Sequence, residues 1–450
     1  MQLRSAMPVS AADLFAWHER PGAFERLTPA FMPATVRSRT GGIEDGSRVT
    51  LSVPVGPLST TWEVEHVGYV AGREFSDVQR SGPFARWQHR HLMDAQPDGT
   101  SVLDDRIEFA LPAPPFGEIV AGHFTRDRLE RLLRWRHALT RMDLERHAAF
   151  ASRGPLRIAI TGASGFLGDA LVPFLTTGGH EVRRIGRRAD SDFLWDPARG
   201  ELDPRALDGV DAVIHLAGAS IAERWTPERR RAIRESRVQG TRLIAEAMAK
   251  ASPRPSVLLS ASAVGVYGDR GDEVLDESSA FGDDFLAGVG REWEAAAARA
   301  RDAGIRTVFL RTGVVLNPGG GALGKMLLPF QAGVGGKLGS GKQWMSWISR
   351  EDWVGAVQFA LMHDSLSGPV NLVAPEAATN ATFTSTLARV LGRPALIPVP
   401  EFALGAVFGE MARGTILASQ RAQPTVLTRA GFAFEHPTLS SALRFELGLL

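Results

Sequence analysis

The 450-residue sequence predicts an α/β protein in which a doubly wound parallel sheet follows an α+β domain. Three observations lead to this prediction. Residues 30–112 alternate apolar and polar side chains, as antiparallel strands do. Residues 116–147 keep apolar side chains at helical spacing. From residue 156 onward, apolar strands recur between helical segments, which is the pattern of a parallel sheet covered by helices.

Composition narrows the class of protein. An apolar share of 44% and a charged share of 22% are globular values. The net charge of +1 provides no basic field, so no nucleic-acid partner is expected. The sequence contains no cysteine, which excludes disulfides and cysteine-based metal sites. No metal site is predicted. Without a signal-like start or an apolar run of membrane-spanning length, we expect a cytoplasmic protein with no membrane span.

The first predicted domain covers residues 1–150. Residues 10–27 predict helix, about six antiparallel strands follow, and the helix over 116–147 closes the domain. We expect this helix to present an inner apolar stripe of Ile119, Phe124, Leu129, Leu132, Leu133 and Leu139. A curved sheet gripping the long helix is the simplest packing.

This pattern resembles the START-like polyketide-cyclase (SRPBCC) superfamily, whose helix-grip fold encloses an apolar cavity. Under that resemblance Trp62, Trp87 and Trp135 are candidates to line a cavity. The alternative is that they form an ordinary aromatic core.

The polar junction ASRGP at 151–155 separates this domain from a Rossmann domain over residues 156–375. The segment LRIAITGASGFLG places Gly162, Gly165 and Gly168 in a G-x-x-G-x-x-G spacing after an apolar strand and before an amphipathic helix. That context predicts a dinucleotide-binding loop, in which helix N-terminal amides face a pyrophosphate. Ser164, Phe166 and Leu167 belong to the same loop. A purely structural strand–helix turn is the alternative.

The second strand of this domain ends in HEVRRIGRRADSD. NAD-selective sites usually carry an acidic residue here, but this chain has Gly186, Arg187 and Arg188. A guanidinium at this place pairs with a 2′-phosphate, which predicts NADP(H). Two solvated arginines are the alternative, and Asp190 and Asp192 leave NAD(H) open.

Four further segments carry a resemblance: HLAGASI (215–221), ERWTPERRRAIRESRVQGTRLI (223–244), residues 311–353 and residues 399–424. Together they resemble the atypical short-chain dehydrogenase/reductase group of NAD-dependent epimerase/dehydratase-like proteins, with its C-terminal extension. The resemblance covers residues 156–450 and implies site roles. Gly186 and Arg187 would meet the adenosine phosphate, and Arg237 would reach a cofactor phosphate or ribose. The resemblance implies that Leu216, Ala217 and Gly218 line the adenine ribose and that Val315 borders the nicotinamide.

The sequence departs from that group at its proton-transfer pair, a tyrosine followed four residues later by a lysine. Counting back from Glu294 puts Leu286 at the tyrosine position and Gly290 at the lysine position. Neither of the two tyrosines, Tyr69 and Tyr267, has a lysine four residues on.

Two residues are the main catalytic candidates, and Asp283, Asp284 and Glu292 near the missing pair are the alternatives. Ser262 matches the serine that hydrogen-bonds a substrate carbonyl in this group. Tyr267 is a proton donor, part of a turn or substrate-pocket wall, or a packing residue. His215 lies inside a strand and is expected to pack beneath the cofactor.

The third predicted region, residues 376–450, is a small α+β subdomain on the substrate side. Its expected short strands are ALIPVP (395–400) and AGFAF (430–434). Glycine-rich segments 319–330 and 339–349 would cover the crevice, with Trp344, Met345 and Trp347 as an apolar lining.

The prediction is therefore an NADP(H)-binding atypical oxidoreductase or epimerase-like enzyme that acts on a small molecule. That molecule is hydrophobic if the front domain serves the same substrate. A non-catalytic NADP(H) sensor or scaffold is the alternative. An epimerase or dehydratase of ordinary mechanism is disfavoured by the missing tyrosine–lysine pair. The sequence leaves the oligomeric state open.

Overall fold

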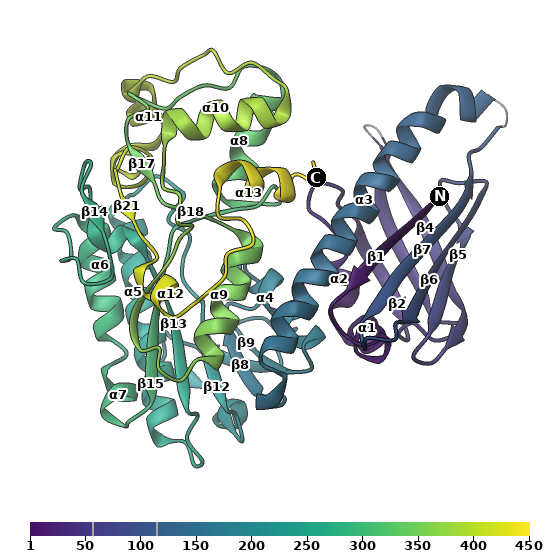
Figure 1. Cartoon of the computed structure of the whole chain (residues 1–450). Coiled ribbons are helices and arrows are strands. Elements are labelled where there is room, and N and C mark those ends of the chain that lie inside the picture. The colour runs from purple at the N-terminus through teal and green to yellow at the C-terminus, as the bar shows by residue number, and fades with distance from the viewer. Residues whose placement is uncertain (56–57, 114–115) are drawn as a thin grey trace. The chain divides into compact units, whose positions relative to one another are not determined.

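The computed structural model describes residues 1–55, 58–113 and 116–450, and its chain forms two compact units (Figure 1). The N-terminal unit comprises Met1–Gly154 with Pro173–Gly179 and Gly448–Leu450. The C-terminal unit comprises Pro155–Val172 and His180–Leu447. The predicted boundaries at 150, 156 and 375 stay predictions.

An antiparallel sheet of seven strands forms the body of the N-terminal unit, in the order β1-β7-β6-β5-β4-β3-β2. The strands are β1 (Gln2–Met7), β2 (Thr35–Thr40), β3 (Arg48–Val55), β4 (Leu58–Val70), β5 (Glu74–Ser81), β6 (Arg86–Ala95) and β7 (Ser101–Ala110). Six of them lie where alternation predicted strands. Alternation did not predict β1, a strand of six residues that lies before the alternating segment and pairs with β7.

The helices of this unit are α1 (Ala11–Glu19), α2 (Ala23–Arg26) and α3 (Phe116–Ala149). Leu129, Leu133 and Leu139 on α3 are buried, as expected. The expected stripe is wrong at its start, because Ile119 and Phe124 are 79% and 61% exposed. Apolar spacing predicts which face of a helix is apolar. It does not predict how far along the helix the packing partner extends.

Aromatic side chains fill part of this core. Trp87 packs with Ile107, Leu129 and Leu133, and it meets Trp62 edge to face at 5.0 Å between ring centroids. This packing favours the aromatic-core interpretation of the tryptophans. The sheet and long helix fit an α+β domain, while the helix-grip assignment stays a prediction.

The C-terminal unit contains the predicted doubly wound sheet. Its eight strands have the order β11-β10-β9-β8-β12-β13-β15-β19, parallel except for the edge strand β11. They are β8 (Arg157–Thr161), β9 (Glu181–Gly186), β10 (Phe193–Asp196), β11 (Glu201–Leu202), β12 (Ala212–His215), β13 (Val257–Ala263), β15 (Arg306–Thr312) and β19 (Gly368–Leu372). The order reverses between β8 and β12, and ligands bind at such a switch point, outside the carboxyl ends of the strands.

The helices of this unit are α4 (Gly168–Thr177), α5 (Pro227–Lys250), α6 (Phe285–Ala295), α7 (Ala298–Asp302), α8 (Gly321–Gln331), α9 (Arg350–Met362), α10 (Asn380–Leu391), α11 (Glu401–Phe408), α12 (Thr425–Arg429) and α13 (Leu439–Glu446). Helix α4 starts in this unit, and its residues from 173 on are counted with the N-terminal unit. Figure 1 shows α8, α10, α11 and α13 gathered at one end of the sheet. Its short helical turns are η2 (Pro204–Leu207), η3 (Val264–Tyr267) and η4 (Ala412–Ile416), and the N-terminal unit ends with η1 (Ala151–Arg153). In the described ranges, no helix is long and apolar enough to cross a membrane.

Six short strands complete the unit: β14 (Val274–Leu275), β16 (Val314–Leu316), β17 (Trp344–Met345), β18 (Trp347–Ser349), β20 (Ala378–Thr379) and β21 (Arg421–Ala422). The two strands expected after residue 390 are wrong. Segment 430–434 is not a strand, and 395–400 contributes only a bridge from Val399 to Leu338. Both segments are short and apolar. Such a segment can pack against neighbouring elements without pairing with a strand, so its apolar character alone does not predict a strand.

Candidate functional site

The loop between β8 and α4 has the shape that its glycines predict. Gly162 has φ +73°, and a Cβ there would lie 2.8 Å from the backbone nitrogen of Ala217. A Cβ on Gly168 would lie 2.4 Å from the carbonyl oxygen of Gly162. Both positions therefore exclude a side chain: the first keeps the loop against the end of β12, and the second lets α4 start close to the turn.

Backbone amides of this loop are free to bind an anion. Gly165 donates to the carbonyl of Gly162 at 2.9 Å. The amides of Ser164, Phe166 and Leu167 donate to no group in the part of the chain that the structure describes. Ser164, Gly165 and Phe166 are also exposed. Such amides at a helix N-terminus favour a phosphate.

The tip of β9 carries the arginines predicted to select NADP(H). Arg187 is exposed and makes no ion pair or hydrogen bond with any described residue. It lines a surface pocket of about 860 Å³ with residues 194–196 and 200–205. Arg188 pairs with Asp190 at 3.2 Å. A Cβ on Gly186 would lie 2.2 Å from the Ser191 hydroxyl oxygen, so that side chain would have to move to admit one.

The acidic residues that left NAD(H) open already have partners. Asp192 accepts from the backbone nitrogen of Arg184 at 2.8 Å and from its guanidinium at 2.9 Å. Asp190 is paired with Arg188. Arg187 is therefore the group at this strand tip that is free to meet an incoming charge.

Hydrogen bonds join the carboxyl ends of β8 and β12. The carbonyl of Thr161 accepts from the amide of Leu216 at 3.1 Å, and its hydroxyl lies 2.6 Å from Nδ1 of His215. The amide of Ala217 donates to the same hydroxyl at 3.3 Å. Burial lowers the pKa of His215 to about 4, so its imidazole is neutral near pH 7. This agrees with the expected packing role of His215.

Arg237 on α5 reaches the loop that follows β12. Its guanidinium donates to the carbonyl of Ala219 at 2.9 Å and lies over the ring of Trp293 at 4.9 Å. A Cβ on Gly218 would be 3.4 Å from its Cζ. Burial, with repulsion from Arg229, lowers the pKa of Arg237 to about 10, which leaves it charged near pH 7.

The two catalytic candidates belong to a buried polar network made of Ser262, Tyr267, Glu294, Arg311 and Asn371. Ser262 donates to Glu294 at 2.8 Å, and Glu294 binds the Arg311 guanidinium at 2.9 and 3.0 Å. The fully buried Tyr267 donates to Asn371 at 2.7 Å and accepts from Arg311 at 3.1 Å. Burial raises the pKa of Tyr267, although the Arg311 charge opposes this effect.

This network favours the packing interpretation of Tyr267, because its hydroxyl is already bound inside the protein. Sequence reasoning missed Arg311 and Asn371. The one available signal was an arginine inside an apolar strand, which demands a buried carboxylate partner somewhere in the fold.

Helix α6 carries the positions that the resemblance assigned to the tyrosine–lysine pair. A Cβ on Gly290 would lie 2.4 Å from Cγ1 of the buried Val266 in η3. Leu286 lies against Gly265 of the same turn. At Gly290 the packing therefore has no room for a lysine side chain.

Helix α8 starts against the phosphate loop. A Cβ on Gly320 would be 2.8 Å from the ring of Phe166, and Lys325 donates to the carbonyl of Ala222 at 3.4 Å. Val315 lies on β16, which leads to this helix and pairs with β18. The start of α8 thus lies beside the phosphate loop, and the expected covering of the crevice by 319–330 and 339–349 stays a prediction.

The predicted apolar lining is wrong for Trp347, which is fully buried. Trp344 and Met345 are half-buried, and Trp344 donates to Asp272 at 2.8 Å.

A parallel sheet with this loop at its switch point defines a nucleotide-binding protein of the dehydrogenase type. The model of the NAD dependent epimerase/dehydratase family matches residues 158–373, and that of a domain of unknown function, DUF1731, matches residues 399–446. The epimerase family protein Mb2239 of Mycobacterium bovis is 46% identical over 292 residues, which cover 64% of this chain and 96% of that protein. The chain belongs to the NAD dependent epimerase/dehydratase family.

Two solved structures extend the comparison. The nucleoside-diphosphate sugar epimerase from Corynebacterium glutamicum is 34% identical with a TM-score of 0.82, and the match covers 100% of this chain and 90% of that one. The human epimerase family protein SDR39U1, solved with NADPH, is 36% identical with a TM-score of 0.61. That match covers 66% of this chain and 100% of the human one.

Proposed function

We propose that the C-terminal unit binds NADP(H) at the switch point and acts on a small molecule as an atypical oxidoreductase or epimerase-like enzyme. Two observations carry this proposal: the amides of Ser164, Phe166 and Leu167 and the guanidinium of Arg187 have no partner among the described residues. The NADPH in the structure of the human relative supports it.

Each group in the crevice has a separate part in binding. The loop amides hold the diphosphate, and Arg187 pairs with the 2′-phosphate, for which a guanidinium is the best partner. The backbone of Leu216, Ala217 and Gly218 lies beside the ribose, and Arg237 adds positive charge behind that segment. The bound cofactor would supply or accept a hydride on the side bordered by Val315.

Tyr267 as proton donor and Ser262 as the group that bonds a substrate carbonyl stay predictions, and both hydroxyls donate to buried partners in this structure. The same observation favours a second candidate function, a non-catalytic NADP(H) sensor or scaffold. The two functions share the cofactor and differ in turnover.

The cofactor proposal is tested by calorimetric titration with NADPH and NADH. We expect NADPH to bind more tightly than NADH. Arg187→Ala should weaken NADPH binding by about 10- to 100-fold, which corresponds to the loss of one charge-assisted hydrogen bond, and should change NADH affinity little. Arg199→Ala, which removes an exposed arginine paired with Glu201, is the control. Equal affinity for both cofactors, or unchanged NADPH affinity in Arg187→Ala, would overturn the assignment.

A measurement of substrate turnover distinguishes the proposed enzyme from the proposed sensor. The substrate panel includes carbonyl compounds, hydrophobic ones among them, and nucleoside-diphosphate sugars, because the Corynebacterium glutamicum relative is a nucleoside-diphosphate sugar epimerase. Tight NADPH binding with no turnover across the panel would favour the sensor.

For the N-terminal unit we propose the helix-grip, START-like arrangement. The antiparallel order of its sheet and the long α3 support it. Buried imidazole and carboxyl groups on that sheet favour a ligand with a polar or charged part over a wholly apolar one.

A further inference from the structure

The N-terminal unit buries imidazole and carboxyl side chains on one face of its sheet. Asp77 on β5 is paired directly with His89 on β6, and Asp105 on β7 is paired directly with His91. Side chains two residues apart on a strand point to the same face, so all four lie together. His89, His91 and Asp105 are at most 6% exposed.

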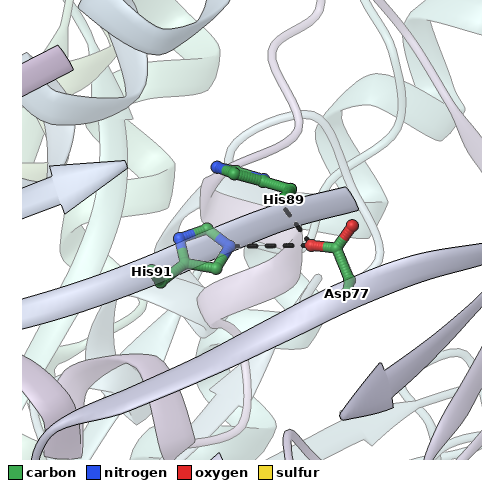
Figure 2. Close-up of side chains that lie close together, drawn as sticks. All are labelled: Asp77, His89 and His91. Carbon is green, nitrogen blue, oxygen red and sulfur yellow. Dashed lines mark ion pairs between the residues drawn. The ribbon is translucent and has the colours of Figure 1, made fainter. Parts of the chain in front are cut away.

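Three of these side chains converge on one point. Figure 2 shows His89 and His91 facing Asp77 from the neighbouring strand. Oδ1 of Asp77 lies 3.5 Å from Nδ1 of His89 and 3.6 Å from Nε2 of His91. The three ligand atoms all lie within 4.8 Å of one another.

These separations suit ligands around a shared ion better than hydrogen bonds. An N–H···O hydrogen bond has its partners at about 2.9–3.0 Å. Donor atoms about 2.0–2.2 Å from a tetrahedral ion lie about 3.3–3.6 Å from one another. The two distances from Asp77 fall in that range.

Outer groups orient the three side chains. Asp105 binds Nδ1 of His91 at 2.8 Å, which leaves Nε2 of that ring toward Asp77. Trp87 donates to Oδ2 of Asp77 at 2.8 Å, which leaves Oδ1 toward the imidazoles. Nε2 of His89 has no hydrogen bond within the described residues and lies 3.6 Å from Asp105. Carboxylate-supported histidines of this kind surround metal ions in proteins.

The charge of the cluster also calls for a cation. Neither Asp77 nor Asp105 forms an ion pair with a lysine or arginine in the described residues. Imidazoles and the Trp87 N–H contact them, and the buried Arg136 guanidinium interacts with both only over a longer distance. Buried carboxylates require a compensating charge.

We propose that Asp77, His89 and His91 bind a divalent transition-metal ion of the zinc class, with Asp105 and Trp87 as positioning residues. Two imidazoles and one carboxylate suit such an ion better than Mg²⁺ or Ca²⁺, which prefer all-oxygen sites. Three protein ligands leave a coordination position for water or an anionic ligand group. This site lies outside the nucleotide-binding unit and does not depend on the proposed function.

The test uses the untagged full-length chain. Metal content is measured after purification, after chelation, and after reloading with Zn²⁺; Co²⁺ is then bound as a spectroscopic probe. We expect about one ion per chain in the reloaded protein, with visible Co²⁺ bands that Zn²⁺ removes.

Variants assign the ligands. Asp77→Asn and His91→Gln should abolish stoichiometric binding, and Asp105→Asn should weaken it about 10- to 100-fold. His123→Gln removes a histidine that is 93% exposed on α3 and should bind like the parent. Circular dichroism melting of each metal-free variant reports the folding of the N-terminal unit independently of the metal. The proposal is overturned if the parent reloads with no more Zn²⁺ than Asp77→Asn, or if all variants bind Zn²⁺ alike; protons would then balance the cluster.

Discussion

At the scale of single residues, contact distances decide which side chains the phosphate loop tolerates. Gly162 lies in the left-handed region of backbone conformation, against the backbone of β12, while Gly165 has only a 3.2 Å approach to one carbonyl. The loop could therefore be predicted from the spacing of glycines after a strand, because that spacing reflects positions where the local backbone leaves little room for a side chain.

We expect Gly162→Ala to lower the free energy of unfolding by about 1–2 kcal/mol through backbone conformation alone, with a further loss from the 2.8 Å clash with Ala217. NADPH binding should be lost with it. Gly165→Ala is the milder control. Chemical denaturation and NADPH titration measure both effects, and equal behaviour of the two variants would contradict this account.

His215 should make stability depend on pH. Below about pH 6.5 the unfolded chain protonates this imidazole, whereas the folded protein does so only near its pKa of about 4. The free energy of unfolding therefore falls as pH drops through that window, by about 2 kcal/mol between about pH 7 and pH 5.

His215→Asn removes the titrating group and keeps a polar atom for Thr161. Denaturant unfolding of both proteins at the two pH values checks the prediction. If the variant loses as much stability on acidification as the parent, His215 is not the cause.

At the scale of elements, the buried polar network joins β13, α6, β15 and β19 through Ser262, Glu294, Arg311 and Asn371. Strands and the loop could be predicted because their signals lie in consecutive residues. This network and the Asp77–His89–His91 cluster could not, because strand register and helix packing bring distant residues together.

Helix α6 offers a matched pair of carboxylates. Glu294 binds the buried Arg311, and Glu292 binds Arg234 at the surface. Glu294→Gln should cost about 3–5 kcal/mol of unfolding free energy, because it leaves a buried guanidinium without its counter-charge. Glu292→Gln should cost at most about 1 kcal/mol. Similar losses in urea unfolding would show that burial does not set the strength of these pairs.

At the scale of the whole molecule, relatives match one unit or both. The Mycobacterium bovis and human proteins match about two thirds of this chain, and the Corynebacterium glutamicum structure matches all of it. Because these matches cover 96% and 100% of the two shorter relatives, we expect the C-terminal unit to fold without the first.

We expect a chain of residues 155–450 to unfold cooperatively and to bind NADPH within a few-fold of the full-length affinity. Circular dichroism melting and calorimetry provide the measurement, with the full chain as reference. Aggregation, or loss of NADPH binding in a folded fragment, would mean that the N-terminal residues complete the nucleotide site.

The contact between Gly290 and Val266 has a consequence for redesign. Grafting the ordinary proton relay onto this scaffold by exchanging Leu286 and Gly290 alone would force a long amine into occupied space. A shorter residue at 266 must come first, so engineering a conventional reductase from this chain requires the turn to be rebuilt before the catalytic pair is installed.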